Sequence, residues 1–107
     1  MKRSGTLDMD VTEGSFVWDL SKEQLNIKKH GVIFLLACAA FNDPLRKIYQ
    51  DKKHSINENR YFCVGRVNYG ILTVRFIYRS DTIRIIGAGY WRKGRRLYYE
   101  EEKEKAD

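Results

Sequence analysis

Three short apolar segments follow one another between residues 61 and 89, and they constrain the fold more than any other feature. Their sequences are YFCVGRV, ILTVRFIYR and TIRIIGAG. The linkers between them, Asn68-Tyr69-Gly70 and Ser80-Asp81, are short enough for tight hairpins. The sequence therefore predicts an antiparallel β-meander.

The middle segment alternates between apolar and polar residues. Its even-numbered positions from 72 to 78 are apolar, whereas Thr73, Arg75 and Arg79 occupy odd-numbered positions. Successive side chains of a strand point to opposite faces, so the sheet should have one apolar face and one arginine face. We expect helices to cover the apolar face and the arginine face to stay available.

The stretch FVWDLSKEQLNIKKHG, residues 16–31, predicts a first helix. Ser21 and Gln24 have capping-box spacing, and the cations of Lys28–His30 complement the dipole at the helix end. Gly31 suits the left-handed position that follows a helix. KKHG is therefore interpreted as a helix junction first and as a contributor to a site second.

Further elements lie on either side of this meander. Val32 to Asn42 predicts a second helix, which Asp43-Pro44 stops, and residues 45–50 predict a short edge strand. A last helix is expected at 91–105. The fold class is α+β: two N-terminal helices, an antiparallel meander of three to four strands and a C-terminal helix. Residues 1–15 are expected to be a flexible leader and residues 16–107 one domain.

Positive charge is concentrated in the meander and the last helix. Residues 60–99 contain nine lysines and arginines against one acidic residue, Asp81. The whole chain has a net charge of +6. Arginine suits bidentate phosphate contacts, so nucleic acid is the favoured partner. An acidic protein partner is the alternative.

The sequence also indicates a compartment. The longest apolar run, Val32 to Phe41, is about half of the roughly 20 residues that span a bilayer, and no signal-peptide pattern opens the chain. Cys38 and Cys63 lie in apolar stretches without metal or redox spacing. We expect a cytoplasmic protein with no membrane contact, no cofactor and no metal site.

Two stretches resemble the BrnT toxin family. FVWDLSKEQLNIKKHGVIFLLACAAFNDP is similar to its F-x-W-D-x-x-K-x-x-x-N-x-x-K-H-G-V-x-F-x-x-A-x-x-x-F-x-D-P opening, and HSINENRYFCVG to its H-S-x-x-E-x-R-x-x-x-I-G segment. TIRIIGAG resembles the family's R-I-I-S-A-R strand. The likeness covers roughly residues 16–101. One departure is Gly89, which stands where the family commonly has arginine.

The resemblance implies an endoribonuclease toxin with a RelE-like fold, which cleaves RNA and inhibits translation. It also implies a BrnA-type antitoxin with a ribbon-helix-helix region. The toxin would contact a DNA operator only through this antitoxin. The alternative is a basic module that binds nucleic acid or a partner without cleaving anything. Gly89 favours that alternative.

Metal-free RNA cleavage needs a base for the 2′-OH, cations for the phosphorane and an acid for the leaving oxygen. His54, Glu58, Arg60 and Arg84 are the candidates for this chemistry. Each also has a structural interpretation: His54 as a solvated loop histidine, Glu58 and Arg60 as a surface ion pair, and Arg84 as a salt-bridge residue.

RNA binding is predicted for a wider set of cationic and aromatic residues. Tyr98, Tyr99 and Trp91 could stack on bases, although helix packing is the better interpretation of at least one tyrosine. The predicted RNA-binding residues are Lys29, His30, Arg75, Arg79, Arg92, Lys93, Arg95 and Tyr99.

Overall fold

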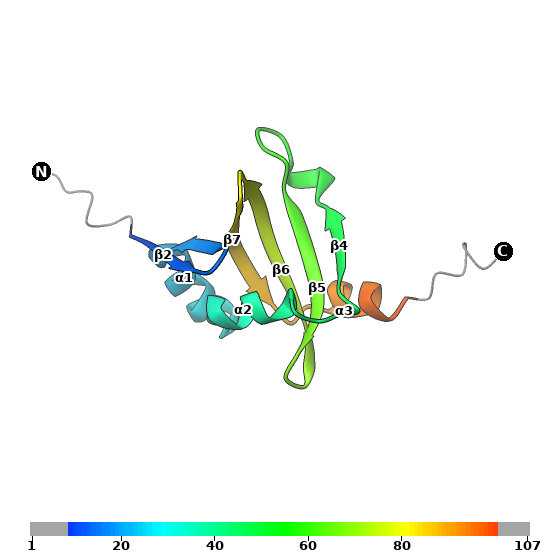
Figure 1. The fold of residues 1–107 in the computed structure, drawn as a ribbon. Coiled ribbons are helices and arrows are strands. Elements are labelled where there is room, and N and C mark those ends of the chain that lie inside the picture. Colours follow the sequence, from blue (N-terminus) through cyan, green and yellow to red (C-terminus); the bar gives the residue numbers. More distant parts are fainter. Residues whose placement is uncertain (1–8, 101–107) are drawn as a thin grey trace, which may run out of the picture.

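The computed structural model describes residues 9–100, which form a six-stranded mixed sheet with three α-helices (Figure 1). The strand order is β2-β3-β7-β6-β5-β4; β3 and β7 run parallel, and the other neighbouring pairs are antiparallel. The α+β class is confirmed, but the three to four strands expected were too few. In chain order the elements are β2 (Asp10–Glu13), β3 (Phe16–Asp19), α1 (Leu20–His30), α2 (Phe34–Ala40), β4 (Lys47–Gln50), the 3₁₀ turn η1 (Lys52–His54), β5 (Tyr61–Val67), β6 (Gly70–Arg79), β7 (Thr82–Gly89) and α3 (Arg92–Tyr99).

The predicted meander is confirmed as β5, β6 and β7. Both connections are tight hairpins, closed by the pairs Val67↔Gly70 and Arg79↔Thr82. Each turn contains one residue with positive φ, Asn68 at 58° and Ser80 at 55°. Such primed turns match the twist of antiparallel strands, which is why these short linkers fix the register. The edge strand β4 is confirmed as well.

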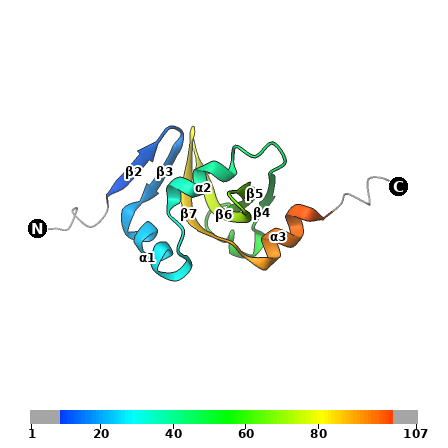
Figure 2. The same ribbon diagram turned by 90° about the horizontal axis from the view of Figure 1, so that it is seen from below.

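The N-terminal region differs from the expectation. Residues 10–13, predicted as part of a leader, form β2, and residues 16–19, predicted as helix, form β3 (Figure 2). β3 pairs with both β2 and β7. Aromatic and β-branched residues favour a strand that packs one face on a core, and Trp18 is only 3% exposed. Residues 1–8 lie outside the described residues.

The first helix begins at Leu20 rather than at residue 16. Its N-cap is Asp19, whose Oδ1 accepts a hydrogen bond from the Ser21 N–H at 2.8 Å, so the predicted capping box of Ser21 and Gln24 was wrong. The helix ends as expected: Gly31 has φ 70°, and its N–H donates to the Ile27 carbonyl. The second helix, α2, is shorter than predicted.

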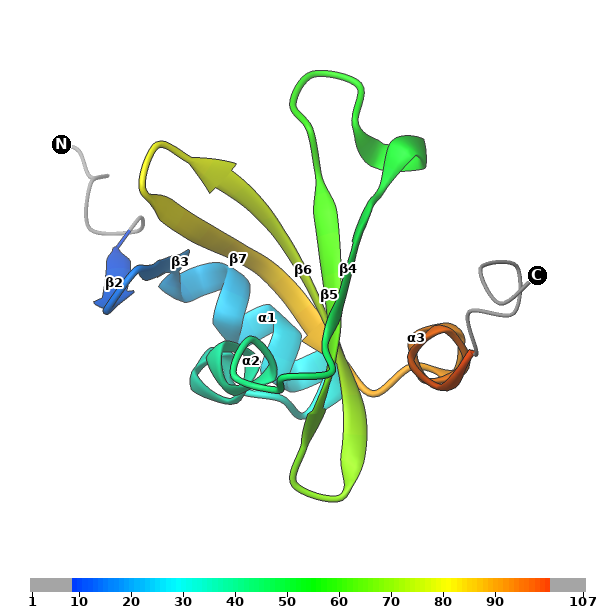
Figure 3. The same ribbon diagram turned by 45° about the vertical axis from the view of Figure 1, so that its right-hand side comes forward.

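Helices α2 and α3 lie on opposite faces of the sheet (Figure 3). On one face Gly65 of β5 lies against the backbone of Ala40, and on the other Gly94 of α3 lies against Thr73. A Cβ at Gly94 would overlap Thr73 Oγ1, so only glycine permits this close approach. The arginine face is therefore partly covered by α3, contrary to the expectation that it stays free.

The two faces carry separate hydrophobic clusters. The larger lies under α1 and α2 and includes Trp18, Phe34 and Phe76. The smaller lies under α3 and consists of Val64, Ile71 and Tyr98, with Tyr49 and Phe62 beside it. The last helix ends at Tyr99, earlier than predicted, because Glu100 is already extended; residues 101–105 of the predicted span lie outside the described residues.

Two polar residues of α1, Asn26 and Glu23, fasten the helices to the sheet. Asn26 is buried; its Nδ2 donates to the Val32 and Ala88 carbonyls, and its Oδ1 accepts from the Ala88 N–H. Glu23 accepts from the Trp18 indole at 3.0 Å and from the Phe34 N–H at 2.8 Å, which caps α2. These residues hold the KKHG junction in place.

Asp43 joins the end of α2 to β5 and α3. Its carboxylate accepts hydrogen bonds from the Tyr98 hydroxyl and from the backbone N–H groups of Arg66 and Leu45. Desolvation alone raises the pKa of Asp43, but these hydrogen bonds outweigh it, so the pKa lies below its usual range. The Asp-Pro signal that ends the helix therefore also orients α3.

No helix within residues 9–100 is long and apolar enough to cross a membrane.

Candidate ribonuclease site

A hollow of about 370 Å³ lies on the arginine face, beside the start of α3. We call it the central hollow. Three parts of the chain enclose it: the η1 turn, the centre of strands β5 and β6, and the first residues of α3. Its lining consists of Asp51, Lys53, His54, Phe62, Thr73, Arg75, Trp91, Lys93 and Gly94.

A second, smaller hollow of about 190 Å³ adjoins the first. Helix α1 forms one of its walls through Lys22, Lys29 and His30. We call it the helix hollow. Arg75 and Trp91 line both hollows, so the two hollows are direct neighbours. KKHG is thus a helix junction whose last two cationic residues also border the candidate site.

Arg75 stands at the centre of the floor because of its strand register. It is paired with Phe62 on β5 and with Gly87 on β7, at the point where a bulge shifts the β6–β7 register. Cross-strand neighbours lie side by side on one face of a sheet. Gly87 lines the helix hollow together with Arg75.

The η1 turn presents His54 to the central hollow. Its Nδ1 lies 3.0 Å from Asp51 Oδ2, and the imidazole is 52% exposed. Ser55 holds the turn closed: its Oγ donates to the Asp51 carbonyl at 2.6 Å and accepts from the Arg60 N–H at 2.9 Å. A carboxylate on Nδ1 favours the tautomer whose Nε2 can accept a proton.

The opposite wall combines cations with free hydrogen-bond donors. Lys93 lies in the first turn of α3, and no side chain caps that helix terminus. Thr73 Oγ1 is buried beside it without a hydrogen-bond partner among the described residues. An uncapped helix N-terminus with a lysine in its first turn favours an anion such as phosphate.

Several predicted site residues lie away from the central hollow. Glu58 forms an ion pair with Arg79 at 3.1 Å, and Arg84 forms a bidentate pair with Asp10 at 2.7 and 3.3 Å. Arg60 lies just before β5, outside the lining. The catalytic roles of Glu58, Arg60 and Arg84 remain predictions.

The outer face of α3 carries another group of the predicted RNA-binding residues. Arg92, Arg95 and Tyr99 line a shallow hollow there together with Arg96 and Glu100. The Tyr99 hydroxyl accepts a hydrogen bond from Arg66, and the Arg95 guanidinium lies over the Tyr99 ring, 5.5 Å from its centroid. This face is separate from His54.

Sequence reasoning missed Asp51, Lys53, Phe62 and Thr73 as lining residues. Thr73 shares the predicted arginine face with Arg75, and Asp51 stands three residues before His54. Both patterns can be read from the sequence, but neither shows which charged side chains come together in the folded chain. Within residues 9–100, no three His, Cys, Asp or Glu side chains are grouped as metal ligands.

Comparison with known proteins identifies the family. The family model described as "Ribonuclease toxin, BrnT, of type II toxin-antitoxin system" matches residues 18–94. That range contains every residue that lines the central hollow. No curated protein matches the chain. The chain therefore belongs to the BrnT family of ribonuclease toxins from type II toxin–antitoxin systems.

Proposed function

We propose that this toxin inhibits translation as a metal-independent endoribonuclease whose reaction takes place in the central hollow. The observation that carries the proposal is the grouping of His54, Arg75 and Lys93 around one hollow beside the start of α3. This arrangement supplies a titratable group and two cations without a metal ion. The expected cellular setting is the cytoplasm.

The reaction begins when the 2′-oxygen attacks the adjacent phosphorus. His54 Nε2 takes the 2′-OH proton, while Asp51 holds Nδ1 and stabilises the imidazolium that forms. Arg75 and the N–H groups at the start of α3 face the equatorial phosphate oxygens, where negative charge builds up.

The P–O5′ bond then breaks, and the leaving oxygen takes a proton. Among the described lining residues, the ammonium groups of Lys53 and Lys93 are the available donors. The products are a 2′,3′-cyclic phosphate and a 5′-hydroxyl end. Lysine regains its proton from water, and His54 returns its proton to water, so the site is restored.

A direct experiment is to incubate the purified toxin with RNA in EDTA and to analyse the fragment ends. Arg75→Ala is paired with Arg79→Ala, and Lys53→Ala with Lys52→Ala, because the second residue of each pair lies outside the hollow. We expect cyclic phosphate ends, and we expect a large loss of cleavage only in the first member of each pair. Equal losses within the pairs would refute this location.

The alternative function, binding without cleavage, is favoured by one observation. Gly89 stands where the resemblance leads one to expect an arginine, and the Trp91 indole occupies the space beside it. Salt-sensitive RNA binding without any cleavage, both in EDTA and with translating ribosomes, would support this alternative.

The family implies an antitoxin partner, and we propose that it is a BrnA-type ribbon-helix-helix protein that alone contacts the operator DNA. The exposed apolar residues Ile33 and Leu35, at the start of α2, support a contact between the antitoxin and this helix. Co-expression with the neighbouring open reading frame, followed by purification, tests this. A toxin that copurifies with no such protein would contradict it.

A further inference from the structure

Trp91 borders three separate hollows. It lies in the central hollow, in the helix hollow and in a third hollow shared with Gly70, Tyr90 and Arg92. The residue is the N-cap of α3 and is half-buried. The other tryptophan, Trp18, is buried in the larger core, so Trp91 is the indole that a ligand can reach.

The indole packs closely against its own chain, at Gly89 and at His30. A Cβ at Gly89 would lie 2.6 Å from Trp91 Cζ2 and 2.8 Å from its Nε1, so only glycine leaves room for this ring position. On another side, His30 contacts the ring edge to face, with centroids 5.1 Å apart. A pre-ordered aromatic surface loses little conformational entropy on binding.

Cations surround this surface on both sides. Arg75 and Lys93 lie toward the central hollow, and Lys29 lies toward the helix hollow. An aromatic platform flanked by cations is the usual means of holding single-stranded nucleic acid, because bases stack while phosphates meet the charges. The two tyrosines at the end of α3 are already engaged: Tyr98 donates to Asp43, and Tyr99 accepts a hydrogen bond from Arg66.

We infer that Trp91 is a stacking platform for one unpaired RNA base next to the scissile phosphate. The nucleotides on either side of that base lie in the central hollow and the helix hollow. The substrate class is therefore single-stranded RNA, since a base within a duplex cannot reach the indole face. This inference rests on the proposed function, of which it specifies the substrate.

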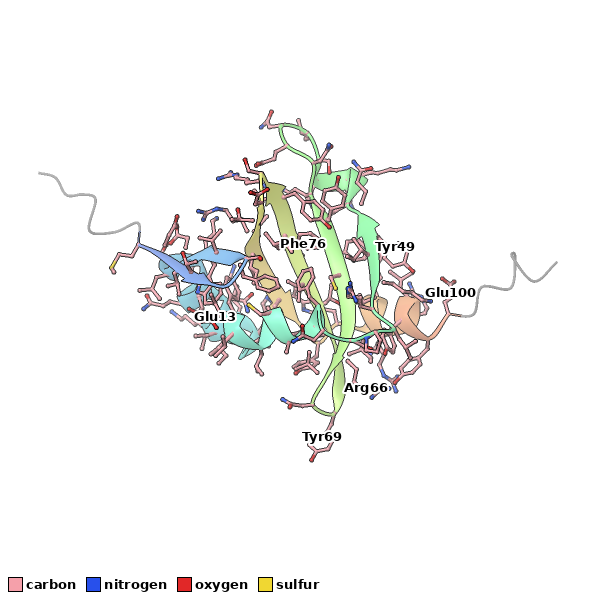
Figure 4. The ribbon with its side chains drawn as sticks, in the orientation of Figure 1. Glu13, Tyr49, Arg66, Tyr69, Phe76 and Glu100 are labelled. Atoms are coloured by element: carbon pink, nitrogen blue, oxygen red, sulfur yellow. The ribbon has the colours of Figure 1, made fainter. Side chains whose placement is uncertain are left out.

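The test uses binding rather than cleavage. A hexanucleotide with 2′-O-methyl groups cannot be cleaved through the 2′-oxygen, and abasic versions of it keep the charge but remove one base at a time. Binding is followed in every variant by the fluorescence anisotropy of a dye attached to the hexanucleotide. In chains that keep Trp91, tryptophan fluorescence is recorded as well, to which buried Trp18 contributes a constant background. The variants are Trp91→Phe, Trp91→Leu and, as a matched control, Tyr69→Leu at the exposed hairpin tip (Figure 4).

The complete hexanucleotide should quench the fluorescence, and one abasic position should weaken binding roughly 5- to 150-fold. Trp91→Leu should bind the complete hexanucleotide and all its abasic versions with the same affinity, whereas Trp91→Phe and Tyr69→Leu should keep the difference in affinity. Equal affinity for all abasic versions, or equal affinity for the hexanucleotide paired with its complementary strand, would overturn the platform. Base-dependent quenching in a protein that cleaves no RNA would refute the proposed reaction and still support the platform.

Discussion

Asn26 offers the sharpest test of how the N-terminal helices are attached to the sheet. Its side chain makes three hydrogen bonds of 2.9–3.0 Å in a buried position, two as donor and one as acceptor. Asn26→Ala removes all three and leaves two carbonyl groups and one N–H without partners. A net hydrogen bond contributes roughly 1 kcal/mol, and a stranded buried group costs about 1–3 kcal/mol.

We therefore expect Asn26→Ala to lower the free energy of unfolding by about 3–6 kcal/mol. A domain of this size has about 5–15 kcal/mol in total, so the variant should be close to unfolded at 37 °C. The measurement is urea denaturation followed by circular dichroism, with the exposed Asn42→Ala as control. A loss below about 1 kcal/mol with an unchanged m value would show that water replaces the Asn26 amide and that our reasoning is wrong.

Three further predictions concern packing and titration. Gly94→Ala should lower stability by about 1–3 kcal/mol and weaken cleavage, and Thr73→Ala should restore part of the stability in the double variant, as denaturation would measure. Tyr98→Phe should cost stability at neutral pH, where the bond to Asp43 is intact. The pKa of Asp43 is lowered, so the stability difference between wild type and Tyr98→Phe should shrink as the pH falls through the pKa of Asp43. The pKa of Tyr98 is raised, chiefly by the same bond, so the stability difference should also shrink above about pH 10. Burial raises the pKa of Cys63 to about 12, so this thiol should react with iodoacetamide only after unfolding, which mass spectrometry can follow.

The meander could be predicted from the sequence because its signals are local. Alternating residues define each strand, and two-residue turns define the pairing. The β2–β3 hairpin could not be predicted in the same way. β3 depends on pairing with β7, some 65 residues later, and it continues into α1 without any break that a sequence pattern would show.

The candidate site was predictable in its residue types but not in its grouping. Arg75 was assigned to the correct face by alternation alone. The meeting of His54, Arg75 and Lys93 requires three distant segments to converge, which no spacing in the sequence indicates. The ion pair of Arg84 with Asp10 corresponds to the structural interpretation of Arg84. Glu58 pairs with Arg79, whereas its structural interpretation gave Arg60 as the partner.

The most direct test of the account compares two candidate bases in the same assay. Single-turnover cleavage of a short RNA in EDTA is measured for the wild type, His54→Ala and Glu58→Ala. General base catalysis contributes about 10²- to 10⁴-fold, so His54→Ala should lose that much while Glu58→Ala stays within a few-fold of the wild type. The reverse order would place the reaction at the Glu58–Arg79 pair and contradict a site in the central hollow.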